Sequence, residues 1–347
     1  GERRITLALG IDGLRIGCWT SSQGPSGCTV VLPPPGTLGA LAVRGSAPGT
    51  REAIALGAAG KVTVCHAVVL SGGSAFGLAT ADGVTSWLEE RSIGYPTRTA
   101  LVPIVGAAIV LDQGVAERAA RPGPAAGRAA CDAAVEEEPP EGSVGAGTGC
   151  TVAKVGGFQH AWRGGQGIAV QRAGGVTVGA VVINNAFGEI RDEDGKWIAR
   201  SRAPRGAPRF PEVLDPDAAS DAANLPGGSG EPPRPGWLEG GELLGGPSEN
   251  TVIGCVASDA RLTKHEGVRV ADLAHSGVSR TVLPAHTSLD GDAIFCLSTG
   301  KVESHVDLVA ALAADVVAEA CRRAVRAAVS RDGLPGLATE GRRAGGV

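Results

Sequence analysis

Five short stretches of this chain are nearly continuous runs of apolar residues, supplied mainly by Val, Ala and Ile. A strand with one face in water alternates apolar and polar side chains, whereas a strand covered on both faces does not. The runs therefore predict strands in sheets that are buried on both sides. They lie at residues 29–32, 66–70, 177–183, 252–258 and 293–298.

Helices are expected between and after these strands, at residues 74–91, about 124–136, about 264–279 and about 304–330. The third begins with Thr263-Lys264-His265-Glu266, a spacing typical of a capping box, in which the Thr and Glu side chains accept hydrogen bonds from each other's backbone N–H groups. Strands and helices of this kind together predict a layered α/β protein.

The charge of the chain is nearly balanced, with 32 Lys and Arg against 36 Asp and Glu and a net charge of −4. This balance excludes the strong basic surface expected of a nucleic-acid-binding protein. No apolar run approaches the roughly 18 to 20 residues that cross a membrane, and the first residues contain no apolar signal-peptide core. We therefore expect a cytoplasmic protein with no nucleic-acid or membrane partner.

Motifs for metals and cofactors are not recognisable. The eight cysteines form no C-x-x-C pair and mostly lie in apolar runs, which predicts reduced cysteines in the core. The six histidines have no spacing typical of metal ligands. The glycine-rich stretches 72–77 and 145–150 match neither a nucleophile elbow nor a nucleotide-binding fingerprint. We expect neither a metal nor an organic cofactor.

One long segment, residues 201–250, differs from the rest because it holds nine of the 22 prolines, many glycines and few apolar runs. A segment of this length without periodicity is typical of a functional or linking region. It ends abruptly at Asn250, and a strongly apolar strand begins with Thr251. A hydroxyl side chain therefore lies at the junction between a proline-rich linker and a buried strand.

This junction suggests an N-terminal nucleophile. If the backbone were cut before Thr251, that residue would carry a free α-amine beside its hydroxyl. Because an α-amine has a pKa of about 7.7–8.0, part of it is neutral at pH 7 and can take the hydroxyl proton. The alternative is an ordinary threonine that begins a strand.

Four further side chains are candidates for the same site. Asp290 and Asp292 flank Gly291 just before a predicted strand, and on an extended chain their carboxylates would point to the same side. They could orient an ammonium or hydroxyl group and perturb each other's pKa, or they could belong to a solvated turn. Lys154 follows an apolar stretch and could equally be a surface lysine. Asn185 ends an apolar strand, where its amide could stabilise an oxyanion or merely mark a turn.

Taken together, these segments resemble the L-aminopeptidase D-Ala-esterase/amidase family, which includes β-peptidyl aminopeptidases and nylon-oligomer endohydrolases. The resemblance covers roughly residues 5–330. The matching stretches are GIDGLRIG (10–17), GCTVV (27–31), RGSAPGTRE (44–52), LSGGSAFGL (70–78), GSVGAGTG (142–149), NTVI (250–253) and DGD (290–292).

The resemblance implies a four-layer αββα sandwich, similar to the fold of N-terminal-nucleophile hydrolases but with a different chain direction. The precursor would cut itself between Asn250 and Thr251. The products would be an α chain, residues 1–250, ending in the linker 201–250, and a β chain, residues 251–347, which remain associated as one structural domain. Family members assemble as homotetramers, and no cofactor is implied.

The resemblance also implies roles for individual residues. Thr251 matches the nucleophile, Asn185 the amide that stabilises the oxyanion and Lys154 a positioning lysine. Asp290 and Asp292 match the acidic pair that orients the nucleophile. Threonine at the nucleophile position and the Asp-Gly-Asp sequence resemble the nylon-oligomer hydrolase branch more than the aminopeptidases, most of which carry serine.

Three functions follow as hypotheses. The first is hydrolysis of linear ω-amino-acid oligomers such as those of 6-aminohexanoate. The second is an aminopeptidase for β-peptidyl or D-/L-Ala amides and esters, with the same mechanism and a small peptide as its substrate. The third, from a different class, is a non-catalytic protein that binds small molecules through its glycine-rich loops.

Overall fold

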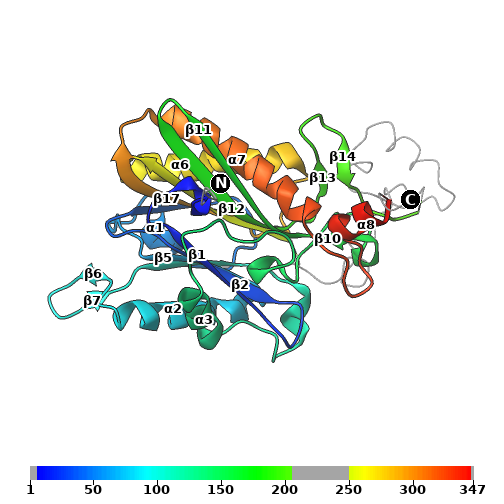
Figure 1. Cartoon of the computed structure of the whole chain (residues 1–347), viewed down its shortest axis with the longest axis horizontal. Helices are drawn as coiled ribbons and strands as arrows, with labels where there is room; N and C mark the ends of the chain where they lie inside the picture. Colours follow the sequence, from blue (N-terminus) through cyan, green and yellow to red (C-terminus); the bar gives the residue numbers. More distant parts are fainter. Residues whose placement is uncertain (1–5, 205–249, 345–347) are drawn as a thin grey trace, which may run out of the picture.

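The structure is a computed structural model that describes residues 6–204 and 250–344 of the 347-residue chain. The predicted linker 201–250 lies largely outside the described residues, and its role stays a prediction. Among the residues that are described, two five-stranded sheets form the centre of the molecule (Figure 1).

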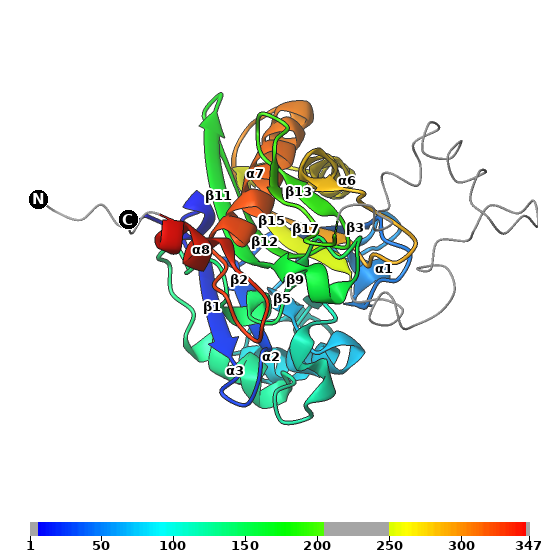
Figure 2. The ribbon, with the colours of Figure 1, turned by 90° about the vertical axis from the view of Figure 1, so that its right-hand side faces the viewer.

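The first sheet has the strand order β11-β12-β15-β17-β3. Its central strands β15 and β17 are parallel, whereas the other neighbours are antiparallel. Figure 2 shows β12, β15 and β17 side by side in this sheet. The strands are β11 (Gly165–Ala173), β12 (Val176–Asn185), β15 (Thr251–Ala260), β17 (Ala293–Val302) and β3 (Leu38–Val43).

The second sheet has the order β1-β2-β5-β8-β4, in which only β5 and β8 are parallel neighbours. Its strands are β1 (Arg15–Thr20), β2 (Gly27–Leu32), β5 (Ala67–Ser71), β8 (Val105–Ile109) and β4 (Thr50–Arg51). The two sheets therefore draw on strands from most of the described chain, and β3 and β4 join the edges of different sheets.

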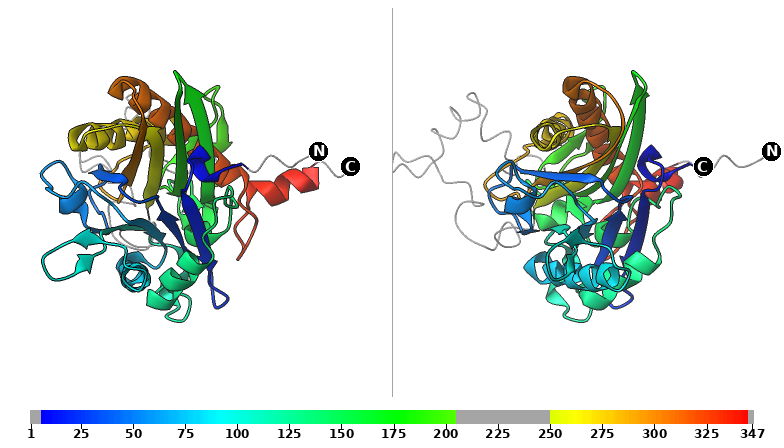
Figure 3. Two further views of the ribbon diagram at one scale, coloured as in Figure 1. Left: turned by 60° about the vertical axis from the view of Figure 1, so that its left-hand side comes forward. Right: turned by 90° about the vertical axis from the view of Figure 1, so that its left-hand side faces the viewer.

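Helices cover the outer face of each sheet. Helices α6 (Lys264–Thr281) and α7 (Val306–Arg326) pack on the first sheet, and α2 (Thr80–Glu89) and α3 (Pro124–Asp132) pack on the second. Figures 1 and 3 show the resulting order of helices, sheet, sheet and helices. The expected four-layer αββα sandwich is confirmed.

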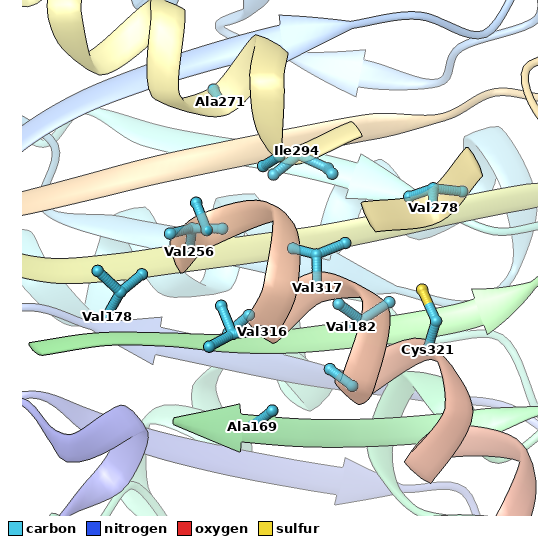
Figure 4. Packing of buried hydrophobic residues seen from close by; sticks show 14 of the residues in the cluster. Ala169, Val178, Val182, Val256, Ala271, Val278, Ile294, Val316, Val317 and Cys321 are labelled. Atoms are coloured by element: carbon cyan, nitrogen blue, oxygen red, sulfur yellow. The ribbon is translucent and has the colours of Figure 1, made fainter. Parts of the chain in front are cut away.

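Three hydrophobic cores fill the spaces between the four layers. The first lies between α6, α7 and the first sheet, where Val178 and Val182 of β12 meet Val316 and Val317 of α7 (Figure 4). The second lies between the sheets, and the third lies beneath α2 and α3. Strand β12 contributes Val178 and Val182 to one core and its alternate residues to the next, which explains why its apolar run is continuous.

Small residues allow helix α7 to approach its neighbours closely. A Cβ atom on Gly167 of β11 would lie 1.9 Å from the carbonyl oxygen of Ala320. A Cβ atom on Gly277 of α6 would lie 2.2 Å from that of Ala314. The abundance of glycine thus has a packing reason at this helix–sheet and helix–helix contact.

The predicted elements agree with the observed ones. All five apolar runs contain strands, and each predicted helix is present, although the first begins as a 3-10 turn, η2 (Ser74–Ala79), before α2. The capping box is confirmed, since the Thr263 hydroxyl accepts from the Glu266 N–H and Glu266 accepts from the Thr263 N–H at 2.7 Å. Seven of the eight cysteines are buried, as expected of core residues.

Shorter elements complete the described chain. They are η1 (Ala8–Gly10), α1 (Ala53–Leu56), β6 (Tyr95–Pro96), β7 (Leu101–Val102), η3 (Gln113–Ala116), η4 (Gly145–Gly147), β9 (Thr151–Val152), η5 (Phe158–His160), β10 (Trp162–Arg163), β13 (Glu189–Arg191), β14 (Trp197–Ala199), β16 (Val282–Leu283) and α8 (Leu337–Ala344). Within the described ranges, no helix has the length and apolar character needed to cross a bilayer.

Candidate active site

Thr251 is the first residue of β15, in the middle of the first sheet. It pairs with Asn185, the last residue of β12, on one side of the strand. Only 4% of its surface is exposed. The predicted nucleophile therefore lies where a central strand begins, with β12 on one side and the segment that leads into β17 on the other.

The Thr251 hydroxyl lies against the peptide group that precedes it. Its Oγ1 donates a hydrogen bond to the carbonyl oxygen of Asn250. The same oxygen accepts from the N–H of Gly291 at 3.1 Å. A hydroxyl, the carbonyl before it and a backbone donor to that carbonyl are the groups that an attack on this peptide bond requires.

Gly291 has no room for a side chain at this point. A Cβ atom there would lie 3.0 Å from the Thr251 hydroxyl oxygen and 2.6 Å from the carbonyl oxygen of Ala47. The loop can therefore bring its N–H to the Asn250 carbonyl only because residue 291 is glycine.

Asp292 connects the start of β15 to a histidine. One carboxylate oxygen accepts from the N–H of Val252, the residue after the nucleophile, at 2.6 Å. The other lies 2.6 Å from Nδ1 of His286. The side chain is 1% exposed. A buried carboxylate with these two partners fixes the backbone position of β15 directly beside Thr251.

Asp290 is bound differently from Asp292. Its Oδ2 atom accepts from both the N–H and the hydroxyl of Thr287, at 2.7 and 2.6 Å. The side chain of Asp290 thereby closes the turn that leads into the Asp-Gly-Asp sequence. That both carboxylates point to the same side of the chain stays a prediction. The alternative of a solvated turn is wrong, since both side chains are buried.

Burial raises the pKa of Asp290 to about 6, and the nearby charge of Asp292 adds to the shift. The hydrogen bonds from Thr287 and the positive charge of Lys154 act in the opposite direction. Asp290 is therefore a carboxyl group that changes charge near neutral pH rather than in strong acid.

This shift makes the stability of the site depend on pH. Because the folded-state pKa exceeds the ordinary value of 3.8, the contribution of Asp290 to stability is fully present below that value and is lost as pH rises through about 6. Replacing Asp290 with Asn keeps an oxygen that can accept both Thr287 bonds. The variant should therefore gain free energy of unfolding relative to the parent between pH 4 and pH 8, by roughly 1–3 kcal/mol.

Urea unfolding at both pH values checks this difference. The two proteins are best compared in a background in which Thr251 is replaced by Val, so that a single chain unfolds. A difference that does not change with pH would contradict the assignment of the raised pKa to Asp290.

Residues 44–47, which follow β3, bind the backbone of the Asp-Gly-Asp loop. The N–H groups of Arg44 and Gly45 donate to the carbonyl of Asp292 at 3.0 and 3.2 Å, and that of Ala47 donates to the carbonyl of Asp290 at 3.0 Å. A Cβ atom on Gly45 would lie 2.2 Å from the Asp292 nitrogen. The stretch RGSAPG thus serves to support the loop through its backbone.

Asn185 lies on the strand that flanks Thr251 on the side away from the acidic loop, and Lys154 contacts its backbone. The Asn185 side chain accepts from the Thr151 N–H at 2.8 Å and donates to the Leu111 carbonyl at 3.0 Å. Lys154 is buried, with 2% exposed, and its Nζ donates to the backbone carbonyl of Asn185 at 3.0 Å. The alternative of a surface lysine is therefore wrong.

A pocket of about 240 Å³ adjoins this side of the site. Thr151 and Leu111, the two residues bridged by the Asn185 side chain, both line it. Its other walls are mainly apolar. The remaining lining residues are Asp112, Gln113, Val115, Ala116 and Phe158.

The fold thus brings all the predicted site residues to one end of β15. Thr251 and Asn250 meet the Asp-Gly-Asp loop through the Gly291 N–H, and Asn185 pairs with Thr251 across the sheet. Two groups were missed from the sequence, namely the Gly291 N–H and the His286 side chain. His286 had one visible signal, because it stands four residues before Asp290 in the same loop.

Solved structures with this architecture define the class of fold. A beta-aminopeptidase from Burkholderia sp. superposes with a TM-score of 0.68 at 19% identity, covering 96% of this chain and 91% of that one. L-aminopeptidase D-Ala-esterase/amidase from Ochrobactrum anthropi gives 0.63 at 19% identity, covering 93% and 86%. The latter is a variant of the N-terminal-nucleophile hydrolase fold, and the present chain has this fold.

Residues 9–339 match the model of peptidase family S58, and the chain belongs to this family. An uncharacterised aminopeptidase of Mycobacterium leprae is 39% identical over 327 residues, which span 89% of this chain and 84% of the relative. A 6-aminohexanoate-oligomer endohydrolase of Kocuria sp. is 32% identical over 301 residues, 86% and 77% of the two chains. The protein is a hydrolase of amide or peptide bonds.

Proposed function

We propose that this hydrolase cuts its own chain between Asn250 and Thr251 and then uses Thr251 as an N-terminal nucleophile. The observation that carries the proposal is the contact of the Thr251 hydroxyl with the Asn250 carbonyl, whose oxygen also accepts from Gly291 at 3.1 Å. The bond from Gly291 belongs to the parallel bridge between Asn250 and Asp290, and it fixes this carbonyl beside the Thr251 hydroxyl.

The self-cutting reaction is an N-to-O acyl shift followed by hydrolysis. The Thr251 oxygen bonds to the Asn250 carbonyl carbon, and the negative charge on the carbonyl oxygen is stabilised by the Gly291 N–H. The C–N bond then breaks, and the hydroxyl proton ends on the leaving nitrogen, which becomes the α-amine of Thr251. Water hydrolyses the resulting ester and frees the Asn250 carboxylate and the Thr251 hydroxyl.

Turnover of a substrate amide repeats these steps between molecules. The Thr251 hydroxyl attacks the substrate carbonyl while its own α-amine takes the proton. The substrate amine leaves with that proton, and water hydrolyses the acyl-enzyme. We assign Asn185 to stabilisation of the oxyanion, Lys154 to positioning near the nucleophile, and Asp290 and Asp292 to the orientation of Thr251.

The substrates that we favour are linear ω-amino-acid oligomers, such as those of 6-aminohexanoate. Two observations support this class. The relatives include a 6-aminohexanoate-oligomer endohydrolase at 32% identity. The pocket beside Asn185 has aliphatic and aromatic walls in Leu111, Val115, Ala116 and Phe158, and such walls suit a chain of methylene groups.

An aminopeptidase for β-peptidyl or alanyl substrates is the second candidate. It is favoured by the mycobacterial relatives named as aminopeptidases, which reach 39% and 40% identity. The non-catalytic binding protein is not supported, because the chain belongs to a peptidase family.

The processed chains are proposed to stay together and to assemble as a homotetramer in the cytoplasm. The first part is supported by the position of β15, which the cut would leave paired with β12 of the other product along eight residue pairs. Eight unpaired cysteines fit a reducing compartment. Size-exclusion chromatography with light scattering would measure the assembly.

One experiment tests the proposed function and separates its two substrate classes. The purified protein is run on a denaturing gel, its smaller band is sequenced, and 6-aminohexanoate oligomers are assayed beside L- and D-alanine p-nitroanilides. We expect a small band that begins Thr-Val-Ile-Gly-Cys and faster hydrolysis of the oligomers. A full-length band that hydrolyses amides at an undiminished rate would refute the N-terminal nucleophile, and faster anilide hydrolysis would favour the aminopeptidase.

A further inference from the structure

His286 is a partly buried polar residue beside the site that the mechanism above does not use. It lies in the loop between β16 and β17, and its backbone is in the left-handed region, with φ of 56°. That conformation costs energy for most residues other than glycine and persists only where the surroundings hold it. Its ring reaches Asp292 on one side and α6 on the other.

When Asp292 is ionised, both ring nitrogens of His286 face oxygen atoms that can only accept. Nδ1 lies 2.6 Å from the Asp292 carboxylate, and Nε2 lies 3.3 Å from the backbone carbonyl of His275. A neutral imidazole has one N–H donor, whereas the protonated ring has two. The two contacts can be made together only by the imidazolium form.

We propose that His286 is a positioning residue for the Thr251 nucleophile, acting as an imidazolium that holds the Asp292 carboxylate against the first peptide of β15. The inference rests on the proposed role of Thr251. His286 does not touch the reacting atoms, and it acts through the 2.6 Å bond between Asp292 and the Val252 N–H.

The charges around Asp292 support this role. A carboxylate that is 1% exposed needs a positive partner. In the part of the chain that the structure describes, His286 is the one group within ion-pairing distance of Asp292. The His286 side chain is itself 15% exposed, so the pair is largely shielded from water.

The neighbouring histidine is in the opposite charge state. Burial lowers the pKa of His275 to about 4, and its Nε2 lies 3.1 Å from the Ala42 carbonyl. The two rings meet edge to face at 5.0 Å. His275 is therefore a neutral support for His286, which it meets through its backbone carbonyl as well as its ring.

The pKa of His286 follows from the same contacts. Burial alone would lower it, but the hydrogen bond and charge of Asp292, the carbonyl of His275 and the charge of Asp290 together raise it above 6.5. Arg44, whose charge acts on the neighbouring His275, is paired with Asp272 at 2.7 Å. Since the folded-state pKa is raised, this stabilisation is complete below pH 6.5 and is lost as pH rises through the folded-state value.

The effect of the His286 charge on rate is best measured in the self-cutting reaction rather than in substrate turnover. Before the cut, residue 251 has no free α-amine, so the ionisation of that amine cannot contribute to the pH profile. Newly translated, radiolabelled full-length chain can be shifted to buffers between pH 6 and pH 9, and its conversion to two bands followed with time. We expect the wild-type rate to fall as His286 loses its proton.

Two substitutions separate the bonds that His286 makes. His286→Asn places an amide nitrogen near the position of Nδ1 and keeps a donor for Asp292, whereas His286→Gln places it near Nε2 and keeps only the bond to His275. Neither can be protonated. Because a hydrogen bond to a charged group is worth more than a neutral one, we expect roughly a tenfold loss of rate in His286→Asn and a 10- to 100-fold loss in His286→Gln.

In both variants the decline of the rate above neutral pH should disappear. His265→Asn is the matched control, because His265 is an exposed histidine on α6, and its rate and profile should equal those of the wild type. Free energies of unfolding are measured on each variant.

The inference is overturned if the decline persists in both variants, or if both lose rate equally in proportion to their lost stability. These outcomes leave the proposed function intact. An uncut wild-type chain that retains full amidase activity would instead refute the role of Thr251, and the inference with it.

Discussion

Replacing Thr251 with Val is expected to leave the chain as a single band of 34.6 kDa and to reduce amide hydrolysis by more than about 10³-fold. Valine has nearly the shape of threonine but no hydroxyl, so it can neither attack the Asn250 carbonyl nor form an acyl-enzyme. The carbonyl oxygen keeps its bond from Gly291 at 3.1 Å, so the substitution leaves no buried acceptor without a donor.

Thr251→Ser is the matched control for this prediction. It keeps the hydroxyl and removes only the γ-methyl group, so the chain should still divide into bands of about 25 and 10 kDa, in proportion to chain length. Denaturing gels and the same amide assay measure both variants. A Val variant that still divides at residue 251 would show that another group performs the cut.

Replacing Asp292 with Asn is expected to slow both self-cutting and turnover by about 10²–10³-fold. The carboxylate accepts from the Val252 N–H and from His286, each at 2.6 Å. An amide of the same shape has one acceptor oxygen, so its NH₂ group must face one of these donors. The start of β15 is then displaced, or His286 is left charged and unpaired.

The same change should also lower the free energy of unfolding, by about 3 kcal/mol, because a buried ion pair loses one partner. Rates are therefore compared at a temperature at which the variant is folded. Asp272→Asn removes the same charge from a half-exposed pair with Arg44 and should change either rate less than about twofold. Equal effects of the two substitutions would indicate a general charge effect rather than the specific bonds of Asp292.

The two predictions address different parts of one site. Thr251 supplies the reacting oxygen, whereas Asp292 places the backbone next to it through Val252. Without the Thr251 hydroxyl no attack can occur. Without the Asp292 carboxylate the hydroxyl is still present, but it is displaced from the carbonyl that it attacks. For that reason the Asp292 variant should retain slow cutting at the correct bond, which N-terminal sequencing of the small band would establish.

Much of the layered architecture could be predicted before the structure was known. The continuous apolar runs indicated strands covered on both faces, and β12 shows the cause, because its alternate residues enter two different cores. The capping box placed the start of α6 at the correct residue. Each of these patterns lies within a few residues of the chain. It predicts the packing correctly because a strand or helix needs only apolar neighbours on each of its apolar faces.

The relation of the acidic loop to the nucleophile could not be predicted in the same way. The spacing of Asp290 and Asp292 suggested an acidic pair, but it did not show that Asp290 binds Thr287 whereas Asp292 binds Val252 and His286. The loop that carries them is held by the backbone N–H groups of Arg44, Gly45 and Ala47, which lie more than 240 positions earlier in the chain.

The sequence alone determined the class of fold, the positions of the main strands and helices, and the presence of a threonine at the start of a buried strand. It could do so because hydrophobic periodicity and helix capping are interactions between residues that are close in the chain. Only the tertiary structure places Asn185, Lys154 and the acidic loop around Thr251 and gives His286 two acceptors. Those contacts depend on the register between β12, β15 and β17, and register is set by the packing of distant segments rather than by any one of them.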